Sequence, residues 1–325
     1  MQSFPLSAHG IRASRLILGC MSLGGGWNSD PISRADLEAG ARAVDAALAA
    51  GITMFDHADI YTRGKAETVF GEILRQRPGL RERIVIQSKC GIRFADDAGP
   101  GRFDFSRTHI LASVEGSLRR LQTDFLDVLL LHRPDPLMEP AEIAEAFQAL
   151  RTAGKVRHFG VSNMNVGQIQ FLQRALSYPL IVNQLEMSLA HRHWLDQGVH
   201  VNQSAGTAVH FGEGLLEFSQ AEGIQLQAWG PLAKGIFTGA TPSDASTSVF
   251  ETAALVRKLA DNWGAAPEAV VLGWLMRHPA GIQPVIGTIR PERIAACAAA
   301  ERIAERMSRE DWYALYVAAR GAPMP

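Results

Sequence analysis

Residues 126–133 read LDVLLLHR, a continuous apolar run that closes on a histidine. Such a run is typical of a strand in a parallel sheet that is covered on both faces. The segment before it repeats apolar residues at helical spacing from Leu111 to Leu121, and Ser106 is the predicted N-cap of that helix. The local unit is therefore an amphipathic helix next to a buried strand.

The same unit recurs along the chain. Seven more short runs rich in apolar and β-branched residues alternate with longer amphipathic patterns, and Ser33 with Asp36 resembles a capping box before the first of these helices. The runs lie at 15–20, 53–58, 83–90, 157–163, 180–187, 224–230 and 282–288. Eight strands alternating with helices predict an α/β fold, a (β/α)8 TIM barrel, with an extra C-terminal helix at 308–320 and loops on the active-site face.

A doubly wound sheet is the alternative α/β fold. It normally carries G-x-G-x-x-G after its first strand. The nearest match, Gly212-Glu213-Gly214, has Glu217 in place of the third glycine and follows no predicted strand. The barrel is therefore favoured. Because no linker or shift in composition divides the chain, we expect one domain over residues 1–325.

Charge and cysteine content limit the partners and the compartment. The 325 residues include 32 Lys and Arg against 33 Asp and Glu, and a net charge of -1 offers no electrostatic surface for nucleic acid or an anionic membrane. Cys20, Cys90 and Cys297 are too widely spaced for a zinc or redox motif and fit a reducing compartment. The N-terminal residues lack the pattern of a signal peptide, and no apolar run reaches about 20 residues. We expect a cytoplasmic monomer, with an oligomer as the alternative.

Polar residues close successive predicted strands, at the end of a barrel where function resides. Asp56 and Tyr61 follow the second strand, Lys89 closes the third and His132 closes the fourth. Each alone has a structural explanation: a helix cap, a packed loop aromatic, an amine that reaches solvent, or a hydrogen-bonded core imidazole. Together they form a set suited to proton transfer.

Reduction of a carbonyl group is the chemistry that this set suits best. An ammonium at Lys89 favours the phenolate of Tyr61 and so lowers the pKa of Tyr61, while Asp56 keeps Lys89 protonated and oriented. His132 can donate a hydrogen bond to the carbonyl oxygen. We therefore predict addition of hydride to an aldehyde or ketone, with Tyr61 protonating the developing alkoxide.

A metal-dependent barrel hydrolase is the alternative from another reaction class. His57, Asp59, His132 and Asp135 supply the right types of ligand. Side chains alternate along a strand, however, so His57 points away from the face that carries Asp56. We expect no metal site.

Four short motifs resemble the successive signatures of the aldo-keto reductase superfamily, and particularly a bacterial branch of predicted oxidoreductases. They are DHADIY at 56–61, SK at 88–89, LLH at 130–132 and GVSN at 160–163, in matching order and spacing from Gly19 to about Arg293. The resemblance implies an NADP-dependent reductase of aldehydes and ketones. Its implied catalytic tetrad is Asp56, Tyr61, Lys89 and His132. A noncatalytic NADP(H)-binding subunit, redox-sensing or regulatory, is the alternative on the same fold.

The resemblance also implies where the cofactor lies. NADP(H) is preferred over NAD(H), because guanidinium groups after the eighth strand can bind a 2'-phosphate bidentately. The implied residues are Ser162, Asn163 and Gln184 for the carboxamide, Trp229 for the nicotinamide ring, Gly230, Leu232 and Lys234 for the pyrophosphate, and Gly287, Thr288, Arg290 and Arg293 for the 2'-phosphate. The chain departs from the family pattern at Gly287, where many members have lysine. It departs again at Ala296 and Cys297, where a Glu-Asn pair often contacts adenine.

The expected partner is a small-molecule carbonyl substrate, whose identity the sequence leaves open. Trp27, after the first strand, is a candidate for the pocket wall. The stretch 189–213 is longer than the matching connection in similar proteins and carries four histidines: His191, His193, His200 and His210. This insertion is either a lid over the active site or a solvated loop whose histidines have no function, and the sequence favours the solvated loop.

Overall fold

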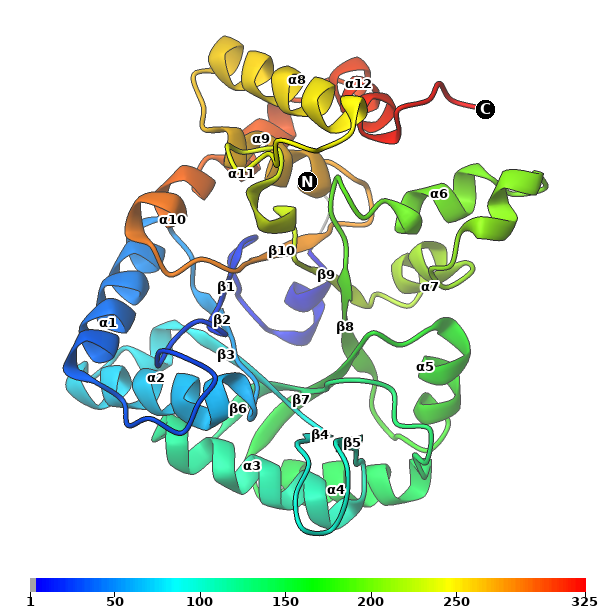
Figure 1. The fold of residues 1–325 in the computed structure, drawn as a ribbon. Helices are drawn as coiled ribbons and strands as arrows, with labels where there is room; N and C mark the ends of the chain where they lie inside the picture. The colour runs from blue at the N-terminus through cyan, green and yellow to red at the C-terminus, as the bar shows by residue number, and fades with distance from the viewer. Residues whose placement is uncertain (1–3) are drawn as a thin grey trace.

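Eight parallel strands close into a barrel (Figure 1). In this computed structural model, which describes residues 4–325, hydrogen-bonded neighbours follow the order β1, β10, β9, β8, β7, β6, β3, β2. The strands are β1 (Ile17–Gly19), β2 (Met54–Asp56), β3 (Val85–Cys90), β6 (Leu126–Leu131), β7 (Val156–Ser162), β8 (Leu180–Glu186), β9 (Gln225–Trp229) and β10 (Gln283–Ile286). Each overlaps one of the predicted runs, so the predicted barrel is confirmed.

Helices surround the barrel. α1 (Arg34–Ala49) begins at the predicted capping box of Ser33 and Asp36. α3 (Arg107–Leu121) begins after Ser106, whose side chain accepts a hydrogen bond from the backbone N–H of His109. The others around the barrel are α2 (Lys65–Gln76), α4 (Pro140–Thr152), α5 (Val166–Gln173), α7 (Leu215–Ala221), α9 (Pro267–Met276) and α10 (Pro291–Cys297). None of the helices in the described chain has the length and apolarity that crossing a membrane requires.

A further group of helices packs on α9. α11 (Ala300–Arg306) contacts α9 directly, and α8 (Thr247–Trp263) packs on α12 (Arg309–Arg320) (Figure 1). α12 is the predicted extra C-terminal helix. Its Trp312 stacks on Trp274 of α9 with ring centroids 5.2 Å apart, and each indole N–H donates to the other residue's backbone oxygen. The C-terminal helix is thus fixed to the barrel wall.

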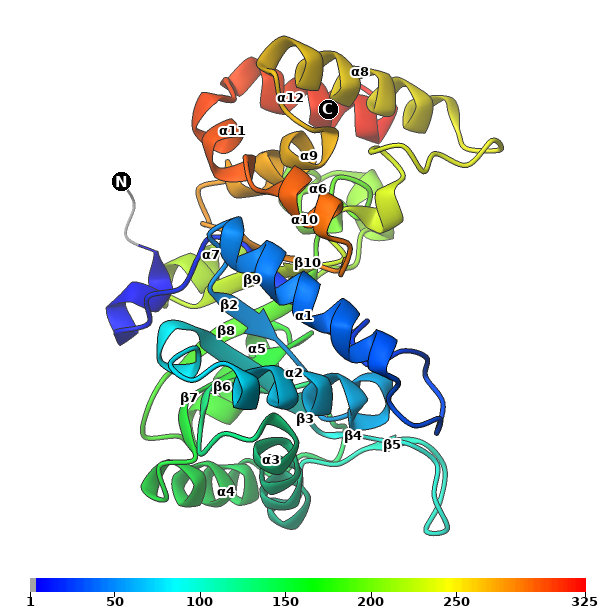
Figure 2. The same ribbon diagram turned by 90° about the vertical axis from the view of Figure 1, so that its left-hand side faces the viewer.

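The two ends of the barrel differ. At the amino ends of the strands, η1 (Pro5–His9) closes the opening, and its Leu6 packs with Ile17, Met54 and Val85 inside the barrel. At the opposite end, the hairpin of β4 (Ile92–Arg93) and β5 (Arg102–Phe103) projects outward together with the loop before α1 (Figure 2). The carboxyl ends of the strands are therefore the end where a ligand can enter.

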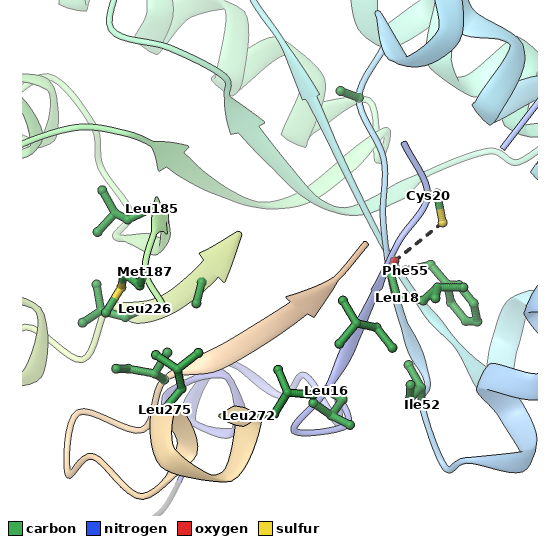
Figure 3. Packing of buried hydrophobic residues seen from close by; sticks show 14 of the residues in the cluster. Leu16, Leu18, Cys20, Ile52, Phe55, Leu185, Met187, Leu226, Leu272 and Leu275 are labelled. Atoms are coloured by element: carbon green, nitrogen blue, oxygen red, sulfur yellow. Dashed lines mark hydrogen bonds between the residues drawn. The ribbon is translucent and has the colours of Figure 1, made fainter. Parts of the chain in front are cut away.

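Strand residues that point outward pack against the helices. Figure 3 shows Leu16, Leu18 and Phe55 in one cluster with Leu272 and Leu275 of α9. Leu18 and Phe55 are fully buried. Burial of such a side chain contributes about 1.5–3 kcal/mol, and truncating one to alanine typically costs about 2–5 kcal/mol. This outer layer holds the strands in the positions that shape the barrel mouth.

The glycine of the GVSN motif is needed for close packing of strands. A Cβ atom on Gly160 would lie 2.7 Å from Leu130 Cδ2 and 2.7 Å from the backbone oxygen of Val182. Real Cβ atoms do not approach other atoms so closely, so any larger residue would push β7 away from its neighbours. The glycine therefore keeps Ser162 and Asn163, which follow it, in register with β8.

The stretch 189–213 is partly packed. It contains α6 (His193–Val199), whose Asp196 is buried and accepts a hydrogen bond from Tyr316 of α12 at 2.5 Å. The favoured prediction of a solvated loop is therefore wrong for α6, because Asp196 is buried against α12. A local sequence pattern does not show this contact, since Tyr316 lies 120 residues away. Arg320 of α12 donates to His200 at 3.2 Å. The other histidines are exposed: His191, His193 and His210.

Candidate active site

Lys89 lies at the centre of the candidate active site. Its ammonium nitrogen donates to Asp56 Oδ2 at 2.7 Å, to Tyr61 Oη at 2.8 Å and to the backbone oxygen of His57 at 3.0 Å. These bonds use all three donors of the ammonium group. Lys89 is 1% exposed and Asp56 is 2% exposed, so both charges are shielded from water. The alternation along β2 and β3 places both side chains inside the barrel.

Burial and charge oppose each other in this group. Burial disfavours the ammonium of Lys89, but Asp56 and Tyr61 outweigh it, so the pKa of Lys89 lies above its ordinary value. Burial also raises the pKa of Tyr61, and Lys89 only reduces that effect. The predicted effect of Lys89 is present, but burial outweighs it, so the pKa of Tyr61 lies above its ordinary value. A sequence does not show how far the phenol is desolvated. Tyr61 is held as a neutral phenol beside a cation, a state from which a proton can be given.

His132 lies next to Tyr61. Its backbone N–H donates to the oxygen of Cys90 at 2.9 Å, and its ring meets the Tyr61 ring edge to face with centroids 5.9 Å apart. Burial, followed by the cations of Lys89 and Arg133, lowers the pKa of His132 well below its ordinary value. The ring is therefore neutral and has one N–H to donate. An oxygen held beside both rings can accept a hydrogen bond from each.

The residues considered as metal ligands do not converge. Burial and then the charge of Lys89 lower the pKa of His57 to about 3, and the His57 ring packs against Phe70 with centroids 4.6 Å apart. Asp135 accepts the backbone N–H groups of Phe105 and Leu137. Within residues 4–325, no group of three or more His, Cys, Asp and Glu side chains is arranged to hold a metal ion.

Asp59, which is half-buried, forms an acidic pair with the fully buried Glu67. Glu67 accepts from Ser88 at 2.7 Å and from Arg120 at 2.8 Å. Burial, followed by repulsion from Glu67, raises the pKa of Asp59 to about 7, although the cation of Arg120 opposes the shift. Sequence reasoning missed this pair because it forms only where α2 and α3 pack beside β3. It places a titrating carboxyl group two residues before Tyr61.

The residues predicted to hold a nicotinamide meet at the ends of β7, β8 and β9. Trp229 donates to Asn163 Oδ1 at 3.1 Å, Asn163 donates to Ser162 Oγ at 2.7 Å, and Ser162 donates to the backbone oxygen of Gln184 at 2.8 Å. Asn163 has φ 59°, a left-handed conformation that asparagine tolerates better than most residues. Amide and hydroxyl groups beside an indole ring fit the carboxamide and the aromatic ring of a nicotinamide.

Gln184 also joins a polar layer inside the barrel. Its side-chain nitrogen donates to Asp56 Oδ1 at 3.1 Å and to Gln227 Oε1 at 3.0 Å. Gln87 donates to the same two oxygens at 2.7 and 2.8 Å. Both N–H groups of Gln184 are thus used within the protein, and its oxygen remains as the acceptor for a carboxamide. Sequence reasoning missed Gln87 and Gln227, although an amide within an apolar strand was a signal that could have found them.

The residues predicted for the pyrophosphate form a tight turn after β9. Gly230, Ala233, Lys234 and Gly235 have φ values of 63°, 44°, 58° and 86°. Lys234 is exposed, whereas Leu232 is half-buried. A turn of this kind brings several backbone amides to one surface beside a cation, which suits an anion.

The residues predicted for the 2'-phosphate lie in the loop after β10, except Arg293, which belongs to α10. Gly287, Arg290 and Arg293 are exposed, and Thr288 Oγ1 accepts from the backbone N–H of Arg290 at 3.2 Å. Two exposed arginines that follow a threonine within five residues are groups of the kind that bind a phosphate dianion. Cys297, in contrast, is fully buried, and its thiol donates to the backbone oxygen of Arg293 at 3.2 Å.

Trp27 stands at the barrel mouth. Its ring lies edge to face with Tyr61 at 6.4 Å and with Phe94 at 6.5 Å between centroids. Trp27 is 48% exposed and Phe94 is 39% exposed. The guanidinium of Arg63 lies 5.0 Å from the Phe94 ring centroid. The structure thus brings the predicted wall residue to the phenol of Tyr61 and adds Phe94, which sequence reasoning missed because it lies on the β4–β5 hairpin.

Known proteins resemble this chain in sequence and in architecture. A sequence profile of the aldo/keto reductase family matches residues 15–315. The uncharacterized oxidoreductase YcsN of Bacillus subtilis is 39% identical over 280 residues, which is 85% of this chain and 86% of that protein. A 6-dehydroglucose reductase of Agrobacterium fabrum is 37% identical over 326 residues, covering 99% of both chains.

A solved structure has the same fold with a ligand bound. The aldo-keto reductase of Klebsiella pneumoniae in complex with NADPH superimposes with a TM-score of 0.71 and 28% identity, over 96% of this chain and 92% of that one. The family profile covers all eight strands of the barrel, and the Agrobacterium relative aligns along almost the whole chain. This protein belongs to the aldo/keto reductase family of oxidoreductases.

Proposed function

We propose that this protein reduces an aldehyde or ketone to an alcohol with NADPH. The observation that carries the proposal is the buried contact of Lys89 with both Asp56 and Tyr61, at 2.7 and 2.8 Å, beside the neutral imidazole of His132. No side chain can donate hydride, and NADPH, when bound, supplies it. The protein supplies orientation, charge and a proton.

Each member of the tetrad has a distinct role in this proposal. The neutral His132 donates a hydrogen bond to the carbonyl oxygen and polarises it. Tyr61 gives its phenolic proton to the oxygen as negative charge develops there. Lys89 stabilises the phenolate that remains, and Asp56 keeps the ammonium charged and fixed. Trp27 and Phe94 would line the mouth beside the substrate.

The cofactor is proposed to lie across the carboxyl ends of β7 to β10. Ser162, Asn163 and the oxygen of Gln184 would hold the carboxamide, and Trp229 would pack on the ring. Gly230, Leu232 and Lys234 would meet the pyrophosphate, while Gly287, Thr288, Arg290 and Arg293 would meet the 2'-phosphate. The preference for NADP(H) over NAD(H) is supported by the two exposed arginines and by the related Klebsiella enzyme, whose structure contains NADPH.

The substrate is proposed to be a small carbonyl compound with a flat or polyhydroxylated body. Trp27 and Phe94 offer aromatic faces next to Tyr61, and such faces bind both planar rings and the C–H faces of sugars. The Agrobacterium relative is named for 6-dehydroglucose, which carries an aldehyde on a sugar ring. A sugar aldehyde of this kind is therefore the first physiological candidate to test.

NADPH oxidation with two carbonyl substrates tests the proposed reaction. Purified protein should oxidise NADPH in the presence of 4-nitrobenzaldehyde, and 6-dehydroglucose should be assayed beside it. Tyr61→Phe should abolish turnover while NADPH still binds, whereas Tyr313→Phe, a matched change on α12, should leave the rate unchanged. NADPH binding without turnover of any carbonyl compound would instead support the noncatalytic subunit.

The setting of the enzyme is also part of the proposal. Cys20, Cys90 and Cys297 are free and buried, which fits a reducing compartment such as the cytoplasm. We propose that residues 1–325 act as one domain and as a monomer. Sedimentation of the purified chain would check the oligomeric state.

A further inference from the structure

The interior of the barrel contains a layer of amides around Asp56 of the tetrad. Its members are Gln87 of β3, Gln184 of β8, Gln227 of β9 and Gln283 of β10, and none is more than 2% exposed. Branched aliphatic residues usually fill such layers, and burying an amide is costly unless it is hydrogen-bonded. Rules of this kind are most often broken at functional sites. The hydrogen bonds of this layer therefore need an explanation.

The strand register places these amides at one level. Gln184 is the register partner of Gln227, Gln227 is the partner of Gln283, and Asp56 is the partner of Gln87. Alternation along the strands turns all five side chains inward. The carboxylate of Asp56 thus belongs to the same layer as the four amides.

Four hydrogen bonds form a closed ring in this layer. The nitrogen of Gln87 donates to Asp56 Oδ1 at 2.7 Å and to Gln227 Oε1 at 2.8 Å. The nitrogen of Gln184 donates to the same two oxygens at 3.1 and 3.0 Å. Each NH2 group has two hydrogens, so the ring uses the full donor capacity of both amides. Gln227 Oε1 is the atom that holds the two donors together.

The direction of each bond is set by the acceptors at the ends of the network. A carboxylate can only accept, so Gln87 and Gln184 must turn their nitrogens toward Asp56. Gln227 then presents its oxygen to them and donates from its nitrogen to Gln283 Oε1 at 3.1 Å. Gln283 in turn donates to the backbone oxygen of Ser14 at 2.7 Å, at the closed end of the barrel. If the amide of Gln227 were reversed, its NH2 group would face the donor nitrogens of Gln87 and Gln184, and no acceptor would be present there for either of them.

We propose that Gln227 is a positioning residue that aligns the proton donor with the nicotinamide site. Through Gln87 and Gln184 it holds Asp56 Oδ1, so that Asp56 Oδ2 stays on the ammonium of Lys89. Through Gln184 it also fixes the side chain whose oxygen would meet the carboxamide. Gln227 contacts none of the reacting groups and acts only through these neighbours. This inference rests on the proposed function, because Tyr61 and Gln184 have the assumed roles only in the reductase.

Replacing Gln227 by leucine tests the proposal, and the chain provides a matched control. Gln225 lies on the same strand, is also fully buried, and donates only to the backbone oxygens of Leu226 and Gly281 at 2.8 Å. We expect Gln227→Leu to lower kcat about tenfold or more, since small displacements of reacting groups cost rate steeply. The KM for the carbonyl substrate should change less than about twofold, and the pH profile of kcat should shift. Gln225→Leu should keep kcat within about twofold of wild type and leave the profile in place.

A glutamate at position 227 provides a second test that does not depend on an apolar core substitution. A protonated glutamic acid keeps a carbonyl oxygen for Gln87 and Gln184 and an O–H for Gln283, so it mimics the amide. Once ionised, it loses the donor and repels Asp56, and burial should place that ionisation above the usual range of glutamate. Gln227→Glu should therefore approach the wild-type rate near pH 6 and lose activity toward pH 9 more steeply than wild type.

The outcomes separate this inference from the proposed reaction. An active wild type with a folded Gln227→Leu variant of unchanged kcat and pH profile would overturn the positioning role alone. Equal losses in Gln227→Leu and Gln225→Leu would also overturn it, because general damage to the core would then explain both. If Gln227→Leu does not fold, a pH dependence of Gln227→Glu identical to wild type would overturn it. A wild type that binds NADPH but reduces no carbonyl compound would overturn the proposed function and this inference with it.

Discussion

The ammonium of Lys89 lies 2.8 Å from the phenol oxygen of Tyr61, and both groups are buried. In the proposed reaction the proton leaves Tyr61, and the adjacent cation stabilises the phenolate. Lys89→Met removes that cation, so we expect kcat to fall by roughly 10²-fold or more. Steady-state rates across a range of pH check this. Lys258→Met on the exposed face of α8 is the control and should leave kcat unchanged.

Loss of stability must be separated from loss of chemistry in that experiment. Lys89→Met leaves the carboxylate of Asp56 buried without its partner, which typically costs about 3–5 kcal/mol. Adding Asp56→Asn removes the unpaired charge, so the double variant should recover most of the free energy of unfolding but none of the rate. A folded double variant with wild-type kcat would show that Lys89 has no part in proton transfer.

Local patterns explain why the strands and the tetrad could be predicted. Apolar runs predict the strands. Lys89 and His132 each stand at the end of such a run, which places them at the barrel mouth without any knowledge of how the strands and helices pack. The layer around Gln227 and the anchor of Asp196 on Tyr316 depend on residues more than a hundred positions apart, which no local period records. The raised pKa of Tyr61 likewise follows from burial, a property of the folded chain.

Trp27 provides a test of the proposed substrate wall. Its ring lies 6.4 Å from that of Tyr61, so a bound carbonyl compound should rest against it. Aromatic contacts contribute about 0.5–1.5 kcal/mol beyond area burial, and Trp27→Ala should raise the KM for the carbonyl substrate about threefold to tenfold. The KM for NADPH should not change. Phe171→Ala on α5 is the matched control, because Phe171 is similarly exposed, at 51% against 48%. Equal effects of the two substitutions on the KM for the carbonyl substrate would show that Trp27 does not contact that substrate.

Arg293 tests the preference between the two nicotinamide cofactors. The exposed guanidinium is proposed to bind the 2'-phosphate, which NADH lacks. A charge-assisted hydrogen bond contributes about 1.5–3 kcal/mol, so Arg293→Ala should raise the KM for NADPH about tenfold or more and leave the KM for NADH within about twofold. Arg302→Ala, at an exposed site on α11, should change neither. A clear preference for NADH in wild type, undisturbed by Arg293→Ala, would contradict the proposed phosphate site.

Asp59 predicts an unusual dependence of stability on pH. Burial and repulsion from Glu67 raise the pKa of Asp59 from 3.8 to about 7. Between those values the folded chain keeps a proton that the unfolded chain has released, so the free energy of unfolding should fall as the pH rises from about 4 to about 7. Asparagine carries no charge at any of these pH values. The stability gained by Asp59→Asn should therefore grow between pH 5 and pH 8, by at most about 3 kcal/mol.

Urea unfolding at pH 5 and pH 8 measures this gain directly. Asp244→Asn is the control, because Asp244 is an exposed carboxylate outside the cluster and its replacement should have the same small effect at both pH values. A gain from Asp59→Asn that does not change with pH would mean that Asp59 is already ionised in the folded chain at pH 5. The cation of Arg120 would then have to balance two carboxylates, Asp59 as well as Glu67, already at pH 5, and Arg120→Met would destabilise the protein at pH 5 by more than the loss of one ion pair explains.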